Sequence, residues 1–197
     1  MTFKLFGTKI YVSFFFFVLL SLMLCIDQTG ILLPTLVATF LHELGHLLAM
    51  KNCGVSPTAV RLIPTSVQIV RPFCKQHGDE VFIALAGPLT NLLLSLVFFG
   101  IFAWTKAVSP LIFSLLNLIL AVFNLLPVAG LDGGVVLLHL LNRRFIPTTS
   151  LAVLRTVGFG FAAAFFGVGI WFFLNGKINL SFFILPLYFT LCSLLKI

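Results

Sequence analysis

The sequence predicts an all-α membrane protein with about six transmembrane helices. Of its 197 residues, 60% are hydrophobic and 9% are charged, whereas about a quarter of the residues of an ordinary soluble protein are charged. So few charges could not cover the apolar surface of a soluble fold. No polar segment is long enough to fold by itself, so we expect one polytopic domain over residues 1–197.

Six apolar runs define the expected helices, because roughly 20 apolar residues cross a bilayer. The runs cover residues 10–26, 31–50, 80–104, 108–126, 151–174 and 179–195. The first run follows Lys4 and Lys9, as the core of a signal peptide would, but no small-residue cleavage site comes after it. We therefore interpret it as a retained first helix.

The basic residues set the expected orientation. If the N-terminus is cytosolic, ten of the twelve Lys and Arg residues fall in cytosolic segments, and Lys106 and Lys177 fall outside. Cytosolic segments of membrane proteins are enriched in Lys and Arg. The sequence thus predicts a multi-pass protein of the cell membrane with both termini in the cytoplasm. The net charge of +7 is explained by this bias, so no nucleic acid is expected as a partner.

The second run contains "HELGH", residues 42–46, which matches the zinc motif HExxH. On a helix, His42 and His46 lie one turn apart on one face and can bind the same zinc ion. Glu43 is the candidate general base, taking a proton from water and passing it to a leaving amine. The alternative is polar packing between helices. Each ionisable group in a membrane helix costs roughly 2.5–3.5 kcal/mol, which favours the metal.

A catalytic zinc site commonly has three protein ligands, and Asp132 is the candidate for the third. Asp27 is expected in an outside turn, and Asp79 and Glu80 at the start of a helix. Asp132 lies in "NLLPVAGLDGG", residues 124–134, where Pro127 and three glycines predict a broken helix. Broken helices at membrane depth line wet cavities or are buried in protein. The alternative for Asp132 is an ordinary turn aspartate before glycine.

Together these motifs resemble the site-2 protease family of intramembrane zinc metalloproteases. "HELGH", "AGPLTN" (residues 86–91) and "NLLPVAGLDGG" match three family motifs in order and frame a three-helix catalytic core at about residues 31–133. The resemblance implies that His42, His46 and Asp132 bind Zn²⁺, with Glu43 as the general base. It also implies that Asn124 and Pro127 hold an unwound substrate. The bacterial sporulation-type branch, which processes a membrane-associated sigma-factor precursor, is the most similar, and no PDZ-like or nucleotide-sensing domain is expected.

Residues 55–72 contain two short stretches that alternate apolar and polar side chains, as strands do. They predict a short β-hairpin-like segment at the membrane surface, and the alternative is an amphipathic loop. The resemblance favours strands, whose exposed edge would hold an unwound substrate by β-augmentation.

The predicted function is therefore intramembrane zinc endopeptidase activity on a membrane-spanning or membrane-associated protein, near the cytosolic leaflet. The lipid bilayer is the other expected partner, and an inhibitory membrane partner stays open. The alternatives are a metal transporter, a non-catalytic scaffold, and a prenyl-protein type of zinc peptidase. The last takes a later glutamate as its third ligand, and no glutamate follows Glu80.

Overall fold

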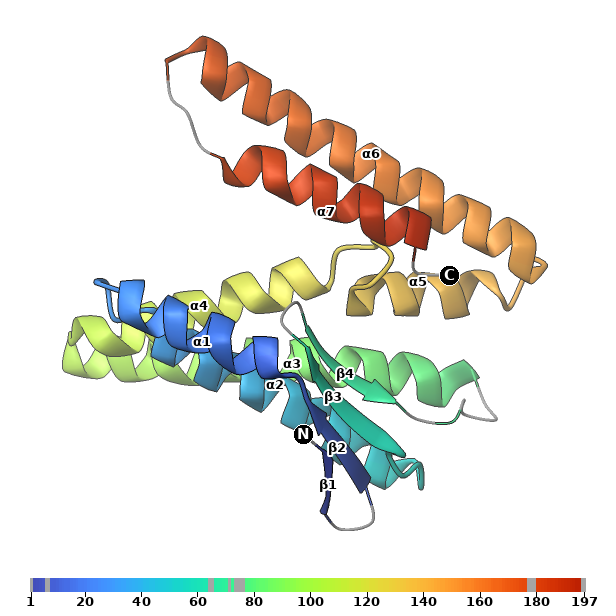
Figure 1. Cartoon of the computed structure of the whole chain (residues 1–197), viewed down its shortest axis with the longest axis horizontal. Coiled ribbons are helices and arrows are strands. Elements are labelled where there is room, and N and C mark those ends of the chain that lie inside the picture. The colour runs from blue at the N-terminus through green and yellow to red at the C-terminus, as the bar shows by residue number, and fades with distance from the viewer. Residues whose placement is uncertain are drawn as a thin grey trace. The chain divides into compact units, whose positions relative to one another are not determined.

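The computed structural model describes residues 2–5, 8–63, 66–70, 72, 77–176 and 180–195. The chain divides into two compact units, Met1–Val122 and Phe123–Ile197. Figure 1 shows the elements along the chain. The first unit holds β1 (Thr2–Leu5), β2 (Thr8–Val12), α1 (Phe14–Ile26), α2 (Leu32–Asn52), β3 (Ala59–Ile63), β4 (Ser66–Val70), α3 (His77–Thr105) and most of α4 (Val108–Asn124). The second holds α5 (Asp132–Leu141), α6 (Pro147–Leu174) and α7 (Ser181–Leu195).

The strands form one four-stranded sheet in the order β1-β2-β3-β4 (Figure 1). The pair β3–β4 is antiparallel, which confirms the strands expected within residues 55–72. The pair β2–β3 is parallel. Parallel neighbours need a long crossover, and here the chain makes it through α1 and α2.

The start of the first helix was predicted wrongly. Residues 10–12 were expected in a helix over 10–26, but α1 begins at Phe14 and residues 8–12 form β2. The segment "TKIYV" contains two β-branched apolar residues, Ile10 and Val12, which suit a strand. Its pairing with β3 stabilises the extended form over the helix.

One face of the sheet packs on the helices of the first unit. Val12 on β2 is buried. Ile69 on β4 contacts a cluster formed by Ala49 and Met50 of α2 and Ile83 of α3. The sheet is therefore anchored where α2 ends and α3 begins.

Within the part of the chain that the structure describes, three helices, α2, α3 and α6, are long and apolar enough to cross a membrane. The helices α1, α4 and α7 correspond to the other three predicted runs but are shorter. The ten-residue helix α5 was not among the predicted helices. In the second unit, Val128 and Leu131 of the α4–α5 loop pack with Ala162 of α6 and Phe189 of α7. That loop therefore lies in the core of its unit.

Candidate metal centre

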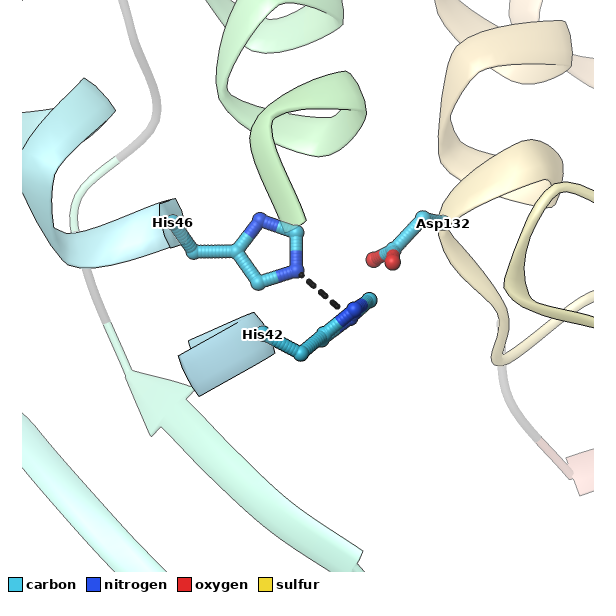
Figure 2. Close-up of side chains that lie close together, drawn as sticks. All are labelled: His42, His46 and Asp132. Atoms are coloured by element: carbon cyan, nitrogen blue, oxygen red, sulfur yellow. Dashed lines mark hydrogen bonds between the residues drawn. The ribbon is translucent and has the colours of Figure 1, made fainter. Parts of the chain in front are cut away.

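The first half of the candidate site is a buried pair of histidines on α2. His42 and His46 lie one helical turn apart, and their side chains are 5% and 7% exposed. Their Nε2 atoms are 3.1 Å apart, and Figure 2 shows the two imidazoles meeting at this point. Two nitrogens bound tetrahedrally to one zinc at about 2.0–2.1 Å are roughly 3.3 Å apart. The observed separation fits two ligands of one ion.

A backbone contact fixes which nitrogen of His46 faces the site. Its Nδ1 donates a hydrogen bond to the carbonyl oxygen of Ile83 on α3, at 2.7 Å. A carbonyl accepts but cannot donate, so the proton of a neutral ring is on Nδ1 and the lone pair is on Nε2. Zinc-binding histidines are commonly oriented by such a bond from the second nitrogen. His46 is therefore set in the tautomer that binds a metal through Nε2.

Glu43 is adjacent to this pair in the sequence of α2. It is half-buried, whereas both histidines are buried. Successive helical residues are about 100° apart, so the carboxylate projects from the side of the histidine face. This places a carboxylate, which can accept and donate protons, beside the two imidazoles.

Asp132 is the first residue of α5, in the second unit, and Figure 2 includes its carboxylate. The preceding loop confirms the predicted helix break, since α4 ends at Asn124 and α5 begins at Asp132, eight residues later. The glycines of "DGG" allow this loop to fold closely: a Cβ on Gly133 would contact the Leu125 carbonyl, and one on Gly134 the Val128 carbonyl. Gly130 has φ of +93°, which favours glycine.

The model of Peptidase family M50 matches residues 30–110 and 104–165 of this chain. The matched residues include both histidines and Asp132. This chain belongs to peptidase family M50. A zinc metalloprotease of Methanocaldococcus jannaschii is 30% identical over 168 residues, covering 79% of this chain and 49% of that protein. Rip3 of Mycobacterium tuberculosis is 38% identical over 113 residues, covering 52% of this chain and 28% of Rip3.

The fold of this M50 family member matches a solved structure. The site-2 protease from Methanocaldococcus jannaschii aligns with a TM-score of 0.72 at 22% identity, over 100% of this chain and 94% of that one. This confirms the predicted site-2 protease fold. The chain spans about half the length of the Methanocaldococcus jannaschii zinc metalloprotease given above.

The two predicted substrate residues lie in the same stretch of the M50 chain as Asp132. Asn124 is the last residue of α4, and Pro127 is in the loop that follows. Both are half-buried. The six predicted residues thus form two groups: His42, Glu43 and His46 on α2 of the first unit, and Asn124, Pro127 and Asp132 in the second.

One residue at the candidate site, Gly87 of the "AGPLTN" motif, was not among the predicted site residues. A Cβ on Gly87 of α3 would contact Nε2 of both His42 and His46. The α3 backbone therefore runs directly against these two imidazole nitrogens. The glycine of "AGPLTN" gave no hint of this, because the contact depends on how α2 and α3 cross.

Proposed function

We propose that this chain is an intramembrane zinc metalloendopeptidase that cuts a membrane-embedded or membrane-associated protein near the cytosolic leaflet. The observation that carries the proposal is the buried His42–His46 pair on the apolar helix α2, with both Nε2 atoms 3.1 Å apart. Such a pair is costly in a membrane unless a partner stabilises it. Membership of family M50 supports the same conclusion.

In the proposed centre, His42, His46 and Asp132 hold the ion. Each offers one ligand atom, giving two imidazole nitrogens and one carboxylate oxygen, a donor set that suits zinc and leaves a fourth position for water. Bound zinc supplies Lewis-acid polarisation and lowers the pKa of water. Glu43 takes the proton of the attacking water and delivers it to the leaving amine. The proton transfer thus needs no further acid.

For the substrate, we assign Asn124, Pro127 and the outer edge of β4. A helical substrate hides its peptide bonds in its own hydrogen bonds, so it must be extended before cleavage. β4 is the terminal strand of the sheet and pairs with β3 on one side. An extended segment can add to such an edge through main-chain hydrogen bonds. The half-buried Asn124 amide is suited to binding the same extended backbone.

Both termini are assigned to the cytoplasm in this proposal, because ten of the twelve basic residues then lie inside. A sporulation-type sigma-factor precursor is one substrate to test, beside other single-span proteins. An inhibitory membrane partner would act by covering the edge of β4. Substrate panels and the accessibility of terminal tags in sealed vesicles separate these possibilities.

The central experiment measures zinc content and cleavage of a single-span substrate by the full chain in one detergent. Glu43→Gln should keep about one zinc per chain and lose cleavage, because the base is removed and the ligands stay. Asp132→Asn should lose most of the zinc. The matched control is Asp27→Asn, which changes a carboxylate of the α1–α2 turn and should keep both properties.

Other outcomes would replace the proposal. Metal uptake into sealed vesicles by Glu43→Gln and wild type alike, without cleavage by either, would indicate a transporter. Metal-free wild-type protein without cleavage would indicate a scaffold. Cleavage by Glu43→Gln at the wild-type rate would rule out the assigned base.

A further inference from the structure

The face of the sheet that points away from the helices carries basic and aromatic side chains. Side chains alternate between faces along a strand, and register partners share a face. Lys9 and Tyr11 of β2 are therefore on one face, with Arg61 of β3 directly opposite Tyr11. The Arg61 guanidinium carbon lies 5.9 Å from the centroid of the Tyr11 ring. We refer to Lys9, Tyr11 and Arg61 as the outer face.

This outer face is open to its surroundings. Lys9 and Arg61 are exposed and Tyr11 is 37% exposed. The opposite face includes Val12, which is buried, and Ile69, which packs on the α2–α3 cluster. The sheet is thus amphipathic, with its basic side turned away from the core of the first unit.

The charge of this region is of one sign. Residues 1–26 and 51–78 contain no Asp or Glu. They contain six basic residues: Lys4, Lys9, Lys51, Arg61, Arg71 and Lys75. No carboxylate in these segments can neutralise the outer face, so it attracts an anionic ligand.

The length of α1 sets the depth of the outer face in the membrane. The helix has 13 residues, about 20 Å at 1.5 Å per residue, against a hydrocarbon core of about 30 Å. About three extended residues of the adjoining strand span the remaining ~10 Å. Counting back from Phe14, which is 71% exposed, this brings Tyr11 to the hydrocarbon boundary. Lys9, and Arg61 with its long side chain, then reach the headgroups.

We propose that the outer face of Lys9, Tyr11 and Arg61 binds the headgroups of anionic phospholipids in the leaflet next to the sheet. Tyrosine is favoured at membrane interfaces, and each basic residue near an anionic surface strengthens binding about fivefold. The binding fixes the sheet at the level of the headgroups. It goes beyond the proposed proteolysis and requires neither zinc nor Glu43.

The first test measures phospholipid retained by the purified full chain from mixed phosphatidylglycerol and phosphatidylcholine, using Glu43→Gln as the background so that proteolysis plays no part. This protein should be enriched in phosphatidylglycerol, and added salt should lower the enrichment. Lys9→Gln with Arg61→Gln should reduce the preference on the order of 25-fold. The matched control, Lys106→Gln with Lys177→Gln, removes two charges elsewhere and should retain it.

Equal enrichment in both double variants would overturn the proposal. So would a wild-type chain without lipid preference that binds a polyglutamate peptide through Lys9 and Arg61, since the outer face would then recognise an acidic protein segment.

A second test reads the position of the sheet directly. Tyr11→Trp is placed in a chain carrying Trp104→Phe and Trp171→Phe, in vesicles containing phosphatidylglycerol. A headgroup-level lipid quencher should reduce the fluorescence of this single tryptophan more than an aqueous quencher does. Quenching from the aqueous phase alone would overturn the proposal, whatever the first test gives.

Discussion

The α2–α3 contact and the α6–α7 contact are both built on small residues, but they serve different neighbours. In the first, a Cβ on Gly45 would contact Thr90 and Ala86, and one on Gly87 would contact both candidate ligand nitrogens. In the second, a Cβ on Gly158 would contact the Ser193 hydroxyl. Small residues allow membrane helices to approach closely in both cases.

The difference lies in whether the neighbour can give way. The Ser193 side chain can rotate, and nothing in the proposed chemistry depends on it. The two imidazoles cannot move without leaving the positions that suit a metal, and His46 is also held by the Ile83 carbonyl. Equivalent substitutions should therefore differ strongly between the two contacts.

The largest expected effect is that of Gly87→Ala. The new methyl group displaces His42 and His46, so we expect zinc affinity to fall at least 10–100-fold, as for changes that reorient ligands, and cleavage with it. The control is Gly100→Ala on the same helix, where a Cβ has no neighbour within 4 Å among the described residues. Zinc titration and cleavage rates measure both. Wild-type zinc affinity in Gly87→Ala would contradict the close approach of α3 to the ligands.

A smaller effect is expected for Gly45→Ala. Its methyl group meets both the Thr90 hydroxyl and the Ala86 carbonyl, so the helices must separate, at a cost of about 1–3 kcal/mol. Thermal unfolding in detergent measures the loss. Thr90→Ala removes one of the two obstacles and should recover part of it in the double variant. Full recovery would mean that the Ala86 backbone does not resist the methyl group.

At the α6–α7 contact, we expect the same kind of substitution to change stability little or to increase it. Gly158→Ala gains helix propensity of up to about 1 kcal/mol and loses a similar amount by moving Ser193. Ser193 is fully buried, and among the described residues its hydroxyl has no hydrogen-bond partner. Adding Ser193→Ala should therefore raise the unfolding temperature above wild type. A double variant less stable than Gly158→Ala alone would show that the hydroxyl has a partner.

The smallest effect concerns the turn before α2. Asp27 accepts hydrogen bonds from the Thr29 hydroxyl and the Leu32 backbone N–H, in that order of influence, and they lower its pKa below 3.8. A depressed folded-state pKa stabilises the fold above the unfolded pKa and ceases to do so as the pH falls through the folded value. Asp27→Asn should lower the unfolding temperature slightly at pH 7, with a difference that shrinks below pH ~4. If the difference in unfolding temperature between wild type and Asp27→Asn were the same at pH 7 and pH 3, the charge of Asp27 would not be the source of the stabilisation.

Much of this architecture follows from local sequence. His42 and His46 are one turn apart in any helix, and "LPVAGLDGG" contains the Pro and Gly residues that end α4 and start α5. Apolar runs gave the long helices to within a few residues, because burial in lipid dominates their composition.

The remaining features depend on long-range contacts. β2 is a strand because β3, about fifty residues later, pairs with it, while residues 10–12 are as apolar as the helix that follows. Gly87 meets the histidines through the crossing of two helices. Neither the β2–β3 pairing nor the α2–α3 crossing can be predicted from the short stretches of sequence that take part in it.

The parallel pairing of β2 with β3 has a consequence for biosynthesis. β2 leaves the ribosome well before β3, and α1 and α2 are made between them. The sheet therefore cannot close until both helices have been inserted and the chain has returned to the side on which it began. β1 and β2 can pair with each other during this time, but the edge of β2 that will join β3 stays without its partner. A fusion at the N-terminus that blocks β2 would therefore trap a chain with inserted helices and an open β3 edge.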